Sequence, residues 1–397
     1  LENFKSLNKT FGYDYCEELL SQIKSYLKEV AEGNIYRYIG VEFIIILEQL
    51  SEGKACDLAD EILERFGNVW KIRGVDCLCS AQIGLCSYPG HATSTDELLK
   101  RLDLAVSAAS DCGPNQMAVY DSNMHTQFVR RQAVAMYLQT ALEKNELEVR
   151  YRPTYNLKEG RFTRADSYMR IFIQGIGLVG AAEFMPIAED SGQIRAIGYY
   201  ALDHAGRCIS ELMNTGREFD SICIPVSPVL LVQEDFLEVL ETYQIPKGKL
   251  ALEVDDSALS NVYLNVNITM QELSDMGVEL VLNNFGSGCA PVSSILDLPI
   301  NTVKLERMFV WQLETNPKSA SIAGGLIQIA RELGIHIIAE GVETENQLNA
   351  LNNYQCEYQQ GFYYAPTMEQ DVLIKVMGTT LDESRVTIEE EKLKMKM

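Results

Sequence analysis

The segment 302–340, TVKLERMFVWQLETNPKSASIAGGLIQIARELGIHIIAE, decides the fold because it joins two short apolar strands through a long amphipathic stretch. The same alternation recurs upstream. Apolar strands are expected at 222–226, 250–254, 279–282, 302–305 and 336–339. Strands that alternate with helices pair in parallel through right-handed crossovers. Five such strands over about 120 residues, with room upstream for three more, predict a (β/α)8 barrel of roughly 250 residues.

The remainder of the 397-residue chain divides into three further parts. Residues 1–122 predict a small α/β domain, with a helix at 11–30, a hairpin at 35–47 and a strand segment at 77–88. The domain begins within this pattern, so we expect a further strand ahead of Leu1. A connector helix is expected at 123–146, the barrel at 147–380, and a charged, solvated tail at 381–397.

Composition excludes several classes of protein. The chain has 34 Lys and Arg against 56 Asp and Glu, which gives a net charge of −22. Such acidity argues against a nucleic-acid-binding face or a basic membrane-surface helix. The chain shows no apolar run long enough for a membrane helix, no signal peptide at its start and no CxxC pair. We therefore expect a cytoplasmic protein, or the cytoplasmic part of a longer one, with reduced cysteines.

Polar residues follow the predicted barrel strands one after another, where barrel enzymes place their chemistry. They are Ser227, Glu253, Asn283 with Asn284, Lys304, Glu340 with Glu343, and Gln360. A series of this kind indicates a functional constellation, because strand interiors would favour Val or Ile. A two-metal hydrolase needs converging carboxylates, one of them shared between the metals. The neutral Asn283-Asn284 pair makes this constellation too weak for a convincing two-metal centre.

Six motifs along the chain match known families: 183–189 (EFMPIAE), 298–305 (LPINTVKL), 339–344 (AEGVET), 360–362 (QGF), 4–8 (FKSLN) and 37–43 (RYIGVEF). Through these motifs the C-terminal 260 or so residues resemble EAL-domain cyclic di-GMP phosphodiesterases, and residues 1–122 resemble GGDEF diguanylate cyclase domains. Together the two resemblances cover nearly the whole chain. The resemblance implies a GGDEF-like α/β domain with a central, mostly antiparallel sheet, followed by an EAL-type TIM-like barrel.

The chain departs from the EAL pattern at the residues that bind metal. The resemblance places the family's metal positions on Asp166, Glu253, Asn283 and Asn284, and its catalytic positions on Glu340 and Lys304. The Glu-Ala-Leu triplet has become 166–168 (DSY), a ligating Asn has become Pro225, and two aspartates have become the asparagine pair. We therefore expect no hydrolysis and no cofactor, with Mg²⁺ or Mn²⁺ the ion if one binds.

The GGDEF motif is equally altered. It reads Ile39-Gly40-Val41-Glu42-Phe43, so that an Ile side chain stands where a glycine lets the backbone approach the nucleotide. Only Glu42 keeps the family's metal-binding acid. We expect no cyclase activity and a packing or dimerisation role for this domain.

Two interpretations of the barrel remain open. In the first it binds cyclic di-GMP without cleaving it, with Arg152, Arg170 and Lys304 in place of the metals and Pro186, Ser227 and Gln360 at further ligand positions. In the second the chain is a scaffold for an unidentified protein partner, and it dimerises through the barrel loop 285–288. A weakly active phosphodiesterase that hydrolyses cyclic di-GMP to linear pGpG with Mg²⁺ or Mn²⁺ is the alternative.

Overall fold

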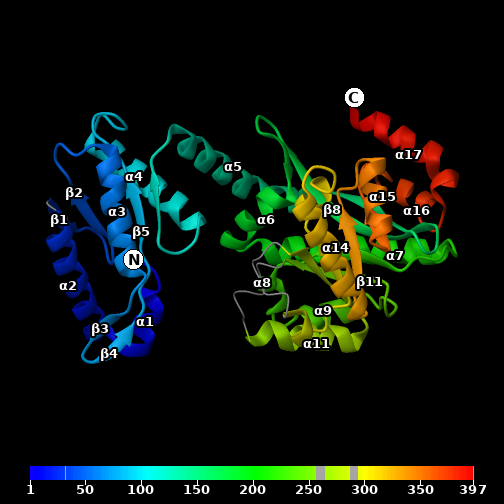
Figure 1. Cartoon of the computed structure of the whole chain (residues 1–397), viewed down its shortest axis with the longest axis horizontal. Helices are drawn as coiled ribbons and strands as arrows, with labels where there is room; N and C mark the ends of the chain where they lie inside the picture. Colours follow the sequence, from blue (N-terminus) through cyan, green and yellow to red (C-terminus); the bar gives the residue numbers. More distant parts are fainter. Residues whose placement is uncertain (32, 256–263, 287–293, 397) are drawn as a thin grey trace. The chain divides into compact units, whose positions relative to one another are not determined.

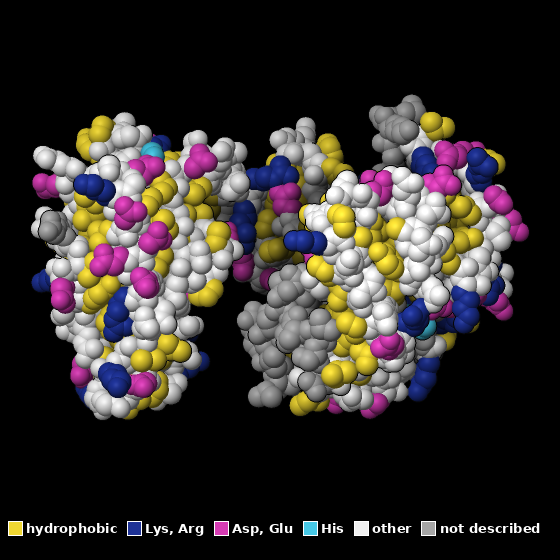
Figure 2. All heavy atoms as spheres, in the orientation of Figure 1, with side chains coloured by type: hydrophobic (Ala, Val, Ile, Leu, Met, Phe, Trp, Pro, Cys, Tyr) yellow, Lys and Arg dark blue, Asp and Glu magenta, His cyan; other side chains and the backbone are white. Residues whose placement is uncertain are grey.

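The computed structural model describes residues 1–31, 33–255, 264–286 and 294–396. The chain separates into two compact units, Leu1–Gln132 and Ala133–Met397. The boundary falls within the long helix α5 (Ser122–Lys144), which the sequence predicted as a connector. Acidic side chains are scattered among apolar and basic ones over the visible face of each unit (Figure 2). Among the described residues, no helix combines the length and the apolarity that a membrane crossing needs.

The N-terminal unit packs helices against short strands (Figure 1). Its elements are α1 (Phe4–Phe11), α2 (Tyr13–Val30), β1 (Asn34–Arg37), β2 (Phe43–Ile46), α3 (Glu52–Phe66), β3 (Trp70–Ile72), β4 (Val75–Cys77), β5 (Gln82–Leu85), α4 (Thr95–Asp111) and β6 (Gln116–Val119). Leu19 and Ile23 lie on one stripe of α2 and are fully buried, as the helical spacing predicts. The Ser94 side chain accepts a hydrogen bond from the Glu97 backbone and caps α4.

The strands of this unit form three separate pairs among the described residues. β1 and β2 pair antiparallel, as predicted, with Gly40 at a φ of 55° in their turn. β3 and β4 form a second hairpin, and β5 pairs with β6 in parallel. The single strand predicted at 77–88 is wrong, because β4 ends at Cys77 and β5 begins only at Gln82. The mixed α/β class is confirmed, although the expected central sheet is present as these pairs.

The C-terminal unit is a closed barrel with helices around it (Figure 1). Its strands are β7 (Glu148–Asn156), β8 (Arg161–Ile173), β9 (Gly177–Gly180), β10 (Ser221–Pro225), β11 (Leu250–Asp255), β12 (Glu279–Phe285), β13 (Thr302–Leu305), β14 (His336–Glu340) and β15 (Tyr358–Gln360). Its helices are α6 (Ala181–Asp190), α7 (Ile194–Asn214), α8 (Pro228–Leu231), α9 (Phe236–Thr242), α11 (Leu264–Met276), α12 (Ser294–Asp297), α13 (Arg307–Trp311), α14 (Pro317–Glu332), α15 (Glu345–Asn353), α16 (Gln370–Val376) and α17 (Leu381–Lys396).

Closure of the barrel confirms the predicted fold and adds one difference in strand direction. The strands follow the order β10, β11, β12, β13, β14, β15, β7 and β8, and β8 pairs back to β10. All five strands predicted from the sequence lie in the run from β10 to β14, and these pair in parallel. β7 is antiparallel to both neighbours, so the barrel is not wholly parallel.

The C-terminal helix α17 does not behave as a solvated tail. Ile388 and Glu391 on this helix are almost fully buried. A carboxylate oxygen of Glu391 lies 3.5 Å from the guanidinium of Arg150 on β7. The prediction of a merely solvated tail is therefore wrong, because one face of the helix packs on the barrel.

Candidate functional site

Barrel closure gathers charged side chains from four strands into one buried cluster. Asp166 comes from β8, Glu253 from β11, Lys304 from β13 and Glu340 from β14. These four residues are called the carboxylate–lysine cluster below. Glu253, Lys304 and Glu340 lie at or near the carboxyl ends of their strands, as the sequence predicted, whereas Asp166 lies within the long strand β8. Parallel strands bring their carboxyl ends to the same rim, which explains why residues so distant in sequence meet here.

Lys304 stands at the centre of this cluster. Its Nζ lies 2.7 Å from Asp166 Oδ2, donates a hydrogen bond to Glu253 Oε2 and lies 3.3 Å from Glu340 Oε1. Only 2% of its side chain is exposed. Burial by itself would lower the pKa of Lys304, but the three carboxylates hold that pKa well above its usual range. Lys304 is therefore an internal cation that neutralises part of the acidic ring.

Glu253 has an altered titration within this cluster. Burial, together with the negative charges of Asp166 and Glu340, raises the pKa of Glu253 to about 7, although Lys304 acts in the opposite direction. Taking a carboxylate out of water disfavours its charged form, and neighbouring carboxylates add to that penalty. The carboxylate–lysine cluster thus holds more negative charge than Lys304 alone compensates.

Gln360 joins Asp166 to a second layer of polar groups. Its Nε2 donates hydrogen bonds to Asp166 Oδ2 at 2.7 Å and to Thr154 Oγ1 at 2.8 Å. The Tyr168 hydroxyl donates to Gln360 Oε1 at 3.2 Å. Burial, and then the charges of Glu340 and Asp166, raises the pKa of Tyr168, so this hydroxyl stays protonated. Asp166 Oδ2 therefore accepts hydrogen bonds from both Lys304 and Gln360.

Arg152 has a different environment from Lys304 and Arg170. Its guanidinium carbon lies 4.9 Å from the ring centroid of Tyr168 and 5.2 Å from that of Phe362. Among the described residues it forms no ion pair, and its buried Nε has no hydrogen-bond partner. Stacking on aromatic rings orients a guanidinium without neutralising it. Arg152 therefore keeps its charge available to an anion.

The two asparagines lie at an irregularity in the barrel. The pairing of β12 with β13 shifts register between Leu282 and Phe285, and Asn284 has a φ of 55°. Asn283 Oδ1 accepts the backbone N–H of Asn284 at 2.8 Å, and Asn284 Nδ2 donates to Asp255 Oδ2 at 2.7 Å. These amides serve local hydrogen bonds and bring no negative charge to the ring.

The donor atoms present do not fit a pair of divalent cations. Asp166, Cys223 and Glu253 bring one ligand atom each to within 4.8 Å of one another. Lys304, however, already donates to one oxygen of each of these carboxylates, Asp166 Oδ2 and Glu253 Oε2. Burial raises the pKa of the Cys223 thiol well above its usual value, whereas a metal requires the thiolate. The ligand atoms of Asp166, Cys223 and Glu253 therefore form one crowded group of three and not a two-metal centre.

Cys223 was missed by the sequence analysis. It stands directly beside Asp166 in the parallel pairing of β10 with β8. Period-two alternation places Cys223 on the same face of its strand as Pro225, the position that the resemblance assigns to a metal ligand. That alternation was the available signal. The aromatic partners of Arg152 gave no comparable signal, because Tyr168 and Phe362 are far apart in sequence.

Several residues predicted to bind ligand lie in other contacts. Arg170 donates two hydrogen bonds to Glu148, at 2.6 and 2.9 Å. Ser227 caps α8 and donates to Glu189 at 2.6 Å. Pro186 is exposed within α6, and Glu343 is exposed after β14. In the N-terminal unit, Ile39 and Glu42 of the altered motif are both exposed.

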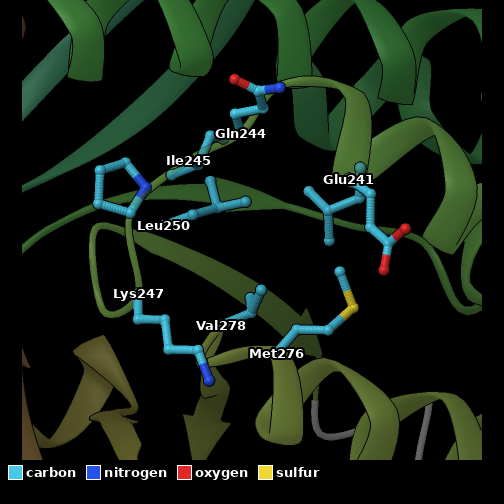
Figure 3. A pocket seen from close by; sticks show the side chains of 10 residues that line it. Glu241, Gln244, Ile245, Lys247, Leu250, Met276 and Val278 are labelled. Atoms are coloured by element: carbon cyan, nitrogen blue, oxygen red, sulfur yellow. The ribbon is translucent and has the colours of Figure 1, made fainter.

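The barrel also contains a separate cavity of about 380 Å³ (Figure 3). Ile245, Leu250, Met276 and Val278 form much of its wall, with Lys247 beside them. Leu250 begins β11 and Val278 precedes β12, so the cavity lies at the amino ends of these strands. That end of a barrel serves stability rather than chemistry. The carboxylate–lysine cluster remains the candidate site.

Comparison with known proteins gives two consecutive family matches. Residues 136–367 match the EAL domain, and residues 1–116 match the diguanylate cyclase, GGDEF domain. Signaling protein YkoW of Bacillus subtilis is 28% identical over 92% of this chain and 46% of its own length. The bifunctional diguanylate cyclase/cyclic di-GMP phosphodiesterase MucR of Pseudomonas aeruginosa is 27% identical over 94% of this chain and 56% of its own length. The chain thus spans about half the length of these curated relatives.

Solved structures agree with the barrel. The PaMucR phosphodiesterase in complex with c-di-GMP superposes with a TM-score of 0.57 at 26% identity, over 60% of this chain and 99% of that one. The FimX EAL domain from Pseudomonas aeruginosa bound to c-di-GMP gives a TM-score of 0.55 at 20% identity, over 62% of this chain and 99% of that one, which supports the fold. The chain belongs to the EAL-domain family and carries a GGDEF domain ahead of its EAL barrel.

Proposed function

We propose that the chain is a catalytically inactive GGDEF–EAL protein of cyclic di-GMP signalling, which acts through protein–protein contacts and binds cyclic di-GMP at the barrel without hydrolysing it. The observation that supports the inactivity is the Asn283–Asn284 pair, whose amides form local hydrogen bonds and bring no negative charge where a two-metal centre needs acids. Two-metal hydrolysis requires carboxylates free to bridge two cations and to activate water between them. In this chain the equivalent positions are an internal ion cluster and two neutral amides.

The ligand-binding part of the proposal rests on Arg152. Arg170 is held by Glu148, and Lys304 is surrounded by acids, so the interpretation with three cations reduces to one. Arg152 is oriented by Tyr168 and Phe362 and is not neutralised by a described carboxylate. A charge-assisted hydrogen bond to a phosphate contributes on the order of 1.5–3 kcal/mol. Loss of that contact corresponds to a drop in affinity of roughly 10- to 150-fold.

Calorimetry with cyclic di-GMP at ~100 μM tests this binding. We expect heat of binding in EDTA that is unchanged by magnesium, since Arg152 and not a metal contacts the phosphate. Arg152→Gln should weaken binding at least ~10-fold. Arg207→Gln is the matched control, because Arg207 is exposed on α7 and pairs with Asp203. Absence of heat with the unaltered chain in EDTA would remove the ligand from the proposal.

The alternative, a weakly active phosphodiesterase, is favoured by one observation. Asp166, Cys223 and Glu253 are close enough to share a single ion. We expect no linear pGpG from the unaltered chain with Mg²⁺ or Mn²⁺, and product from a triple variant carrying Pro225→Asn, Asn283→Asp and Asn284→Asp. Product from the unaltered chain would establish the alternative and overturn the proposed inactivity.

The interaction role includes a homodimer formed through the barrel. The loop on which that prediction rests begins at Phe285, and residues 287–293 lie outside the described residues. Gly286 has a φ of 92°, and a Cβ there would meet Leu326 at 2.6 Å, so this position requires glycine. Light scattering at ~100 μM tests the prediction, and a strict monomer would refute it.

A further inference from the structure

The cavity of about 380 Å³ in Figure 3 is bounded by the chain between α9 and β11 on one side and by the loop from α11 to β12 on the other. Small-molecule sites in proteins have volumes of about 300–1,000 Å³ and are mostly apolar, with a few polar groups. The apolar side chains of this lining are Leu240, Ile245, Pro246, Leu250, Met276 and Val278. Its polar side chains are Glu241, Gln244 and Lys247. In size and chemistry the cavity therefore fits a small molecule.

The walls of this cavity are held in place by backbone contacts. The Gly248 N–H donates to the Gly277 carbonyl at 2.7 Å, which ties the chain before β11 to the loop before β12. Gly277 has a φ of 85°, a conformation that favours glycine. Leu250 begins β11, pairs with Ile222 of β10 and is only 2% exposed. The cavity is thus part of the fixed frame of the barrel.

Lys247 contributes its alkyl stem to the cavity wall. A Cβ at Gly277 would lie 2.7 Å from Lys247 Cγ, so the stem packs directly against this glycine. The ammonium at the end of the stem donates to the Asp275 carbonyl oxygen at 3.3 Å. In Figure 3 the Lys247 nitrogen points away from the apolar side chains at the centre of the view. Lysine commonly covers apolar surface with its methylene groups while its charge stays outside.

Glu241 brings a carboxylate to the rim of the cavity, across from Lys247 in Figure 3. Its side chain is exposed, and no described residue forms a hydrogen bond or an ion pair with it. Glu241 lies in the last turn of α9, where the partial negative charge of the helix end disfavours an acid and favours a nearby cation. Gln244 adds an amide oxygen to the same rim, which is a further acceptor for an N–H donor.

We propose that this cavity is a binding site for an apolar primary amine, a small molecule with an alkyl or aryl body and a protonated amino group. The body packs against Leu250, Met276 and Val278, and the ammonium donates to the Glu241 carboxylate at the rim. Figure 3 shows the thioether end of Met276 on the Glu241 side of the cavity, and methionine adapts readily to groups of different shape. The site is separate from the carboxylate–lysine cluster and does not depend on the function proposed for that cluster.

The charges around the cavity favour an amine over an apolar carboxylic acid. A carboxylate ligand would have to take the Lys247 ammonium from the Asp275 carbonyl oxygen and would be repelled by Glu241. The net charge of −22 also attracts cations and repels anions at long range. Probes that share an eight-carbon body and differ in the head group separate these contributions. The probes are octylamine, 1-octanol and octanoate.

NMR of the methionine methyl groups in the whole chain provides the test, with Met276→Leu identifying the Met276 signal. We expect octylamine to shift this signal with a Kd at or below ~1 mM, as a ligand of that size allows. The affinity of 1-octanol should be at least ~5-fold lower, because it lacks the charge-assisted hydrogen bond, and that of octanoate lower still. Octanoate that binds as tightly as octylamine would overturn the proposal, as would a Met276 signal that octylamine at ~1 mM does not shift.

A pair of variants separates the contact with Glu241 from the general attraction of an acidic protein for amines. Glu241→Gln should reduce the affinity for octylamine to that for 1-octanol and leave the affinity for 1-octanol unchanged. Glu238→Gln is the matched control, because Glu238 is an exposed acid of the same helix that does not line the cavity. It should leave both affinities unchanged. Equal losses of octylamine affinity in the two variants would overturn the proposal, since net charge and not Glu241 would then attract the amine.

Discussion

Replacement of Lys304 by methionine is the most direct test of the internal-cation interpretation. The substitution keeps the length of the side chain and removes its charge from among three buried carboxylates. At an effective dielectric constant of ~20, a charge pair at the 2.7 Å separation from Asp166 attracts by roughly 6 kcal/mol, and one at the 3.3 Å separation from Glu340 by roughly 5 kcal/mol. Desolvation offsets much of this attraction, and breaking a buried pair typically costs about 3–5 kcal/mol. We expect Lys304→Met to lower the free energy of unfolding of the barrel by that amount at pH 8.

The loss of stability caused by Lys304→Met should depend on pH in a definite direction. Glu253 has a pKa of about 7 with the lysine present, above its unfolded value, and Lys304→Met removes the positive charge that holds this pKa down. A carboxyl group with a raised pKa in the folded state stabilises the fold below its unfolded pKa and loses that contribution as the pH rises through the folded value. The stability gap between Lys304→Met and the unaltered chain should therefore widen from pH 5.5 to pH 8.

Urea denaturation read by segment-resolved hydrogen exchange is the assay, because it separates the barrel from the N-terminal unit. Lys318→Met is the control, since Lys318 is exposed at the start of α14 and should change the free energy of unfolding by less than ~0.5 kcal/mol. Millimolar Mg²⁺ should stabilise Lys304→Met more than the unaltered chain, because the freed carboxylates gain a cation. A loss below ~1 kcal/mol at pH 8, or a gap that narrows as the pH rises, would refute the reasoning.

Three further substitutions test other parts of the structure. Burial raises the pKa of Glu279, but the charge of Arg164 and three hydrogen bonds lower this pKa overall. The ionised Glu279 therefore stabilises the fold above its usual pKa of 4.5, and this stabilisation is lost as the pH falls. Glu279→Gln should cost about 3–5 kcal/mol at pH 7 and flatten the acid limb of an unfolding curve, and an unchanged acid limb would contradict this. Gly361→Ala places a Cβ 2.1 Å from the Val342 carbonyl oxygen and should destabilise the barrel by more than ~2 kcal/mol in thermal unfolding, whereas a wild-type melting temperature would show that the backbone yields. A Cβ at Gly84 on β5 would lie 2.8 Å from the Leu102 carbonyl oxygen on α4, so Gly84→Val should lower the stability of the N-terminal unit alone. A loss of stability confined to the barrel would be inconsistent with this close packing of α4 on β5.

Local patterns in the sequence predicted much of the fold. The alternation of short apolar strands with amphipathic helices gave the barrel, and the strands from β10 to β14 are present where the pattern placed them. The hairpin at 35–47 is also a local feature, and it is confirmed. The antiparallel direction of β7 was not predicted, because strand direction depends on how the barrel closes and not on the residues of β7.

The sequence predicted which residues belong to the candidate site, but it did not predict which of their side chains pair with one another. The sequence placed polar residues at the carboxyl ends of the strands, and Asp166, Glu253, Lys304 and Glu340 do meet. It also suggested that Lys304 and Arg170 are free to bind phosphate, whereas the structure pairs one with three acids and the other with Glu148. An ion pair between distant residues has no signature along the chain.

The sequence by itself determined that the chain has two domains of recognisable fold and that the motifs of both are altered. Secondary-structure propensity, hydrophobic periodicity and motif identity are properties of residues that are close together in the chain, so they can be read from it directly. Only the tertiary structure decided which charges neutralise one another. In the sequence, Lys304 is separated from Asp166 by 138 positions and from Glu253 by 51. Only closure of the barrel brings these side chains into contact.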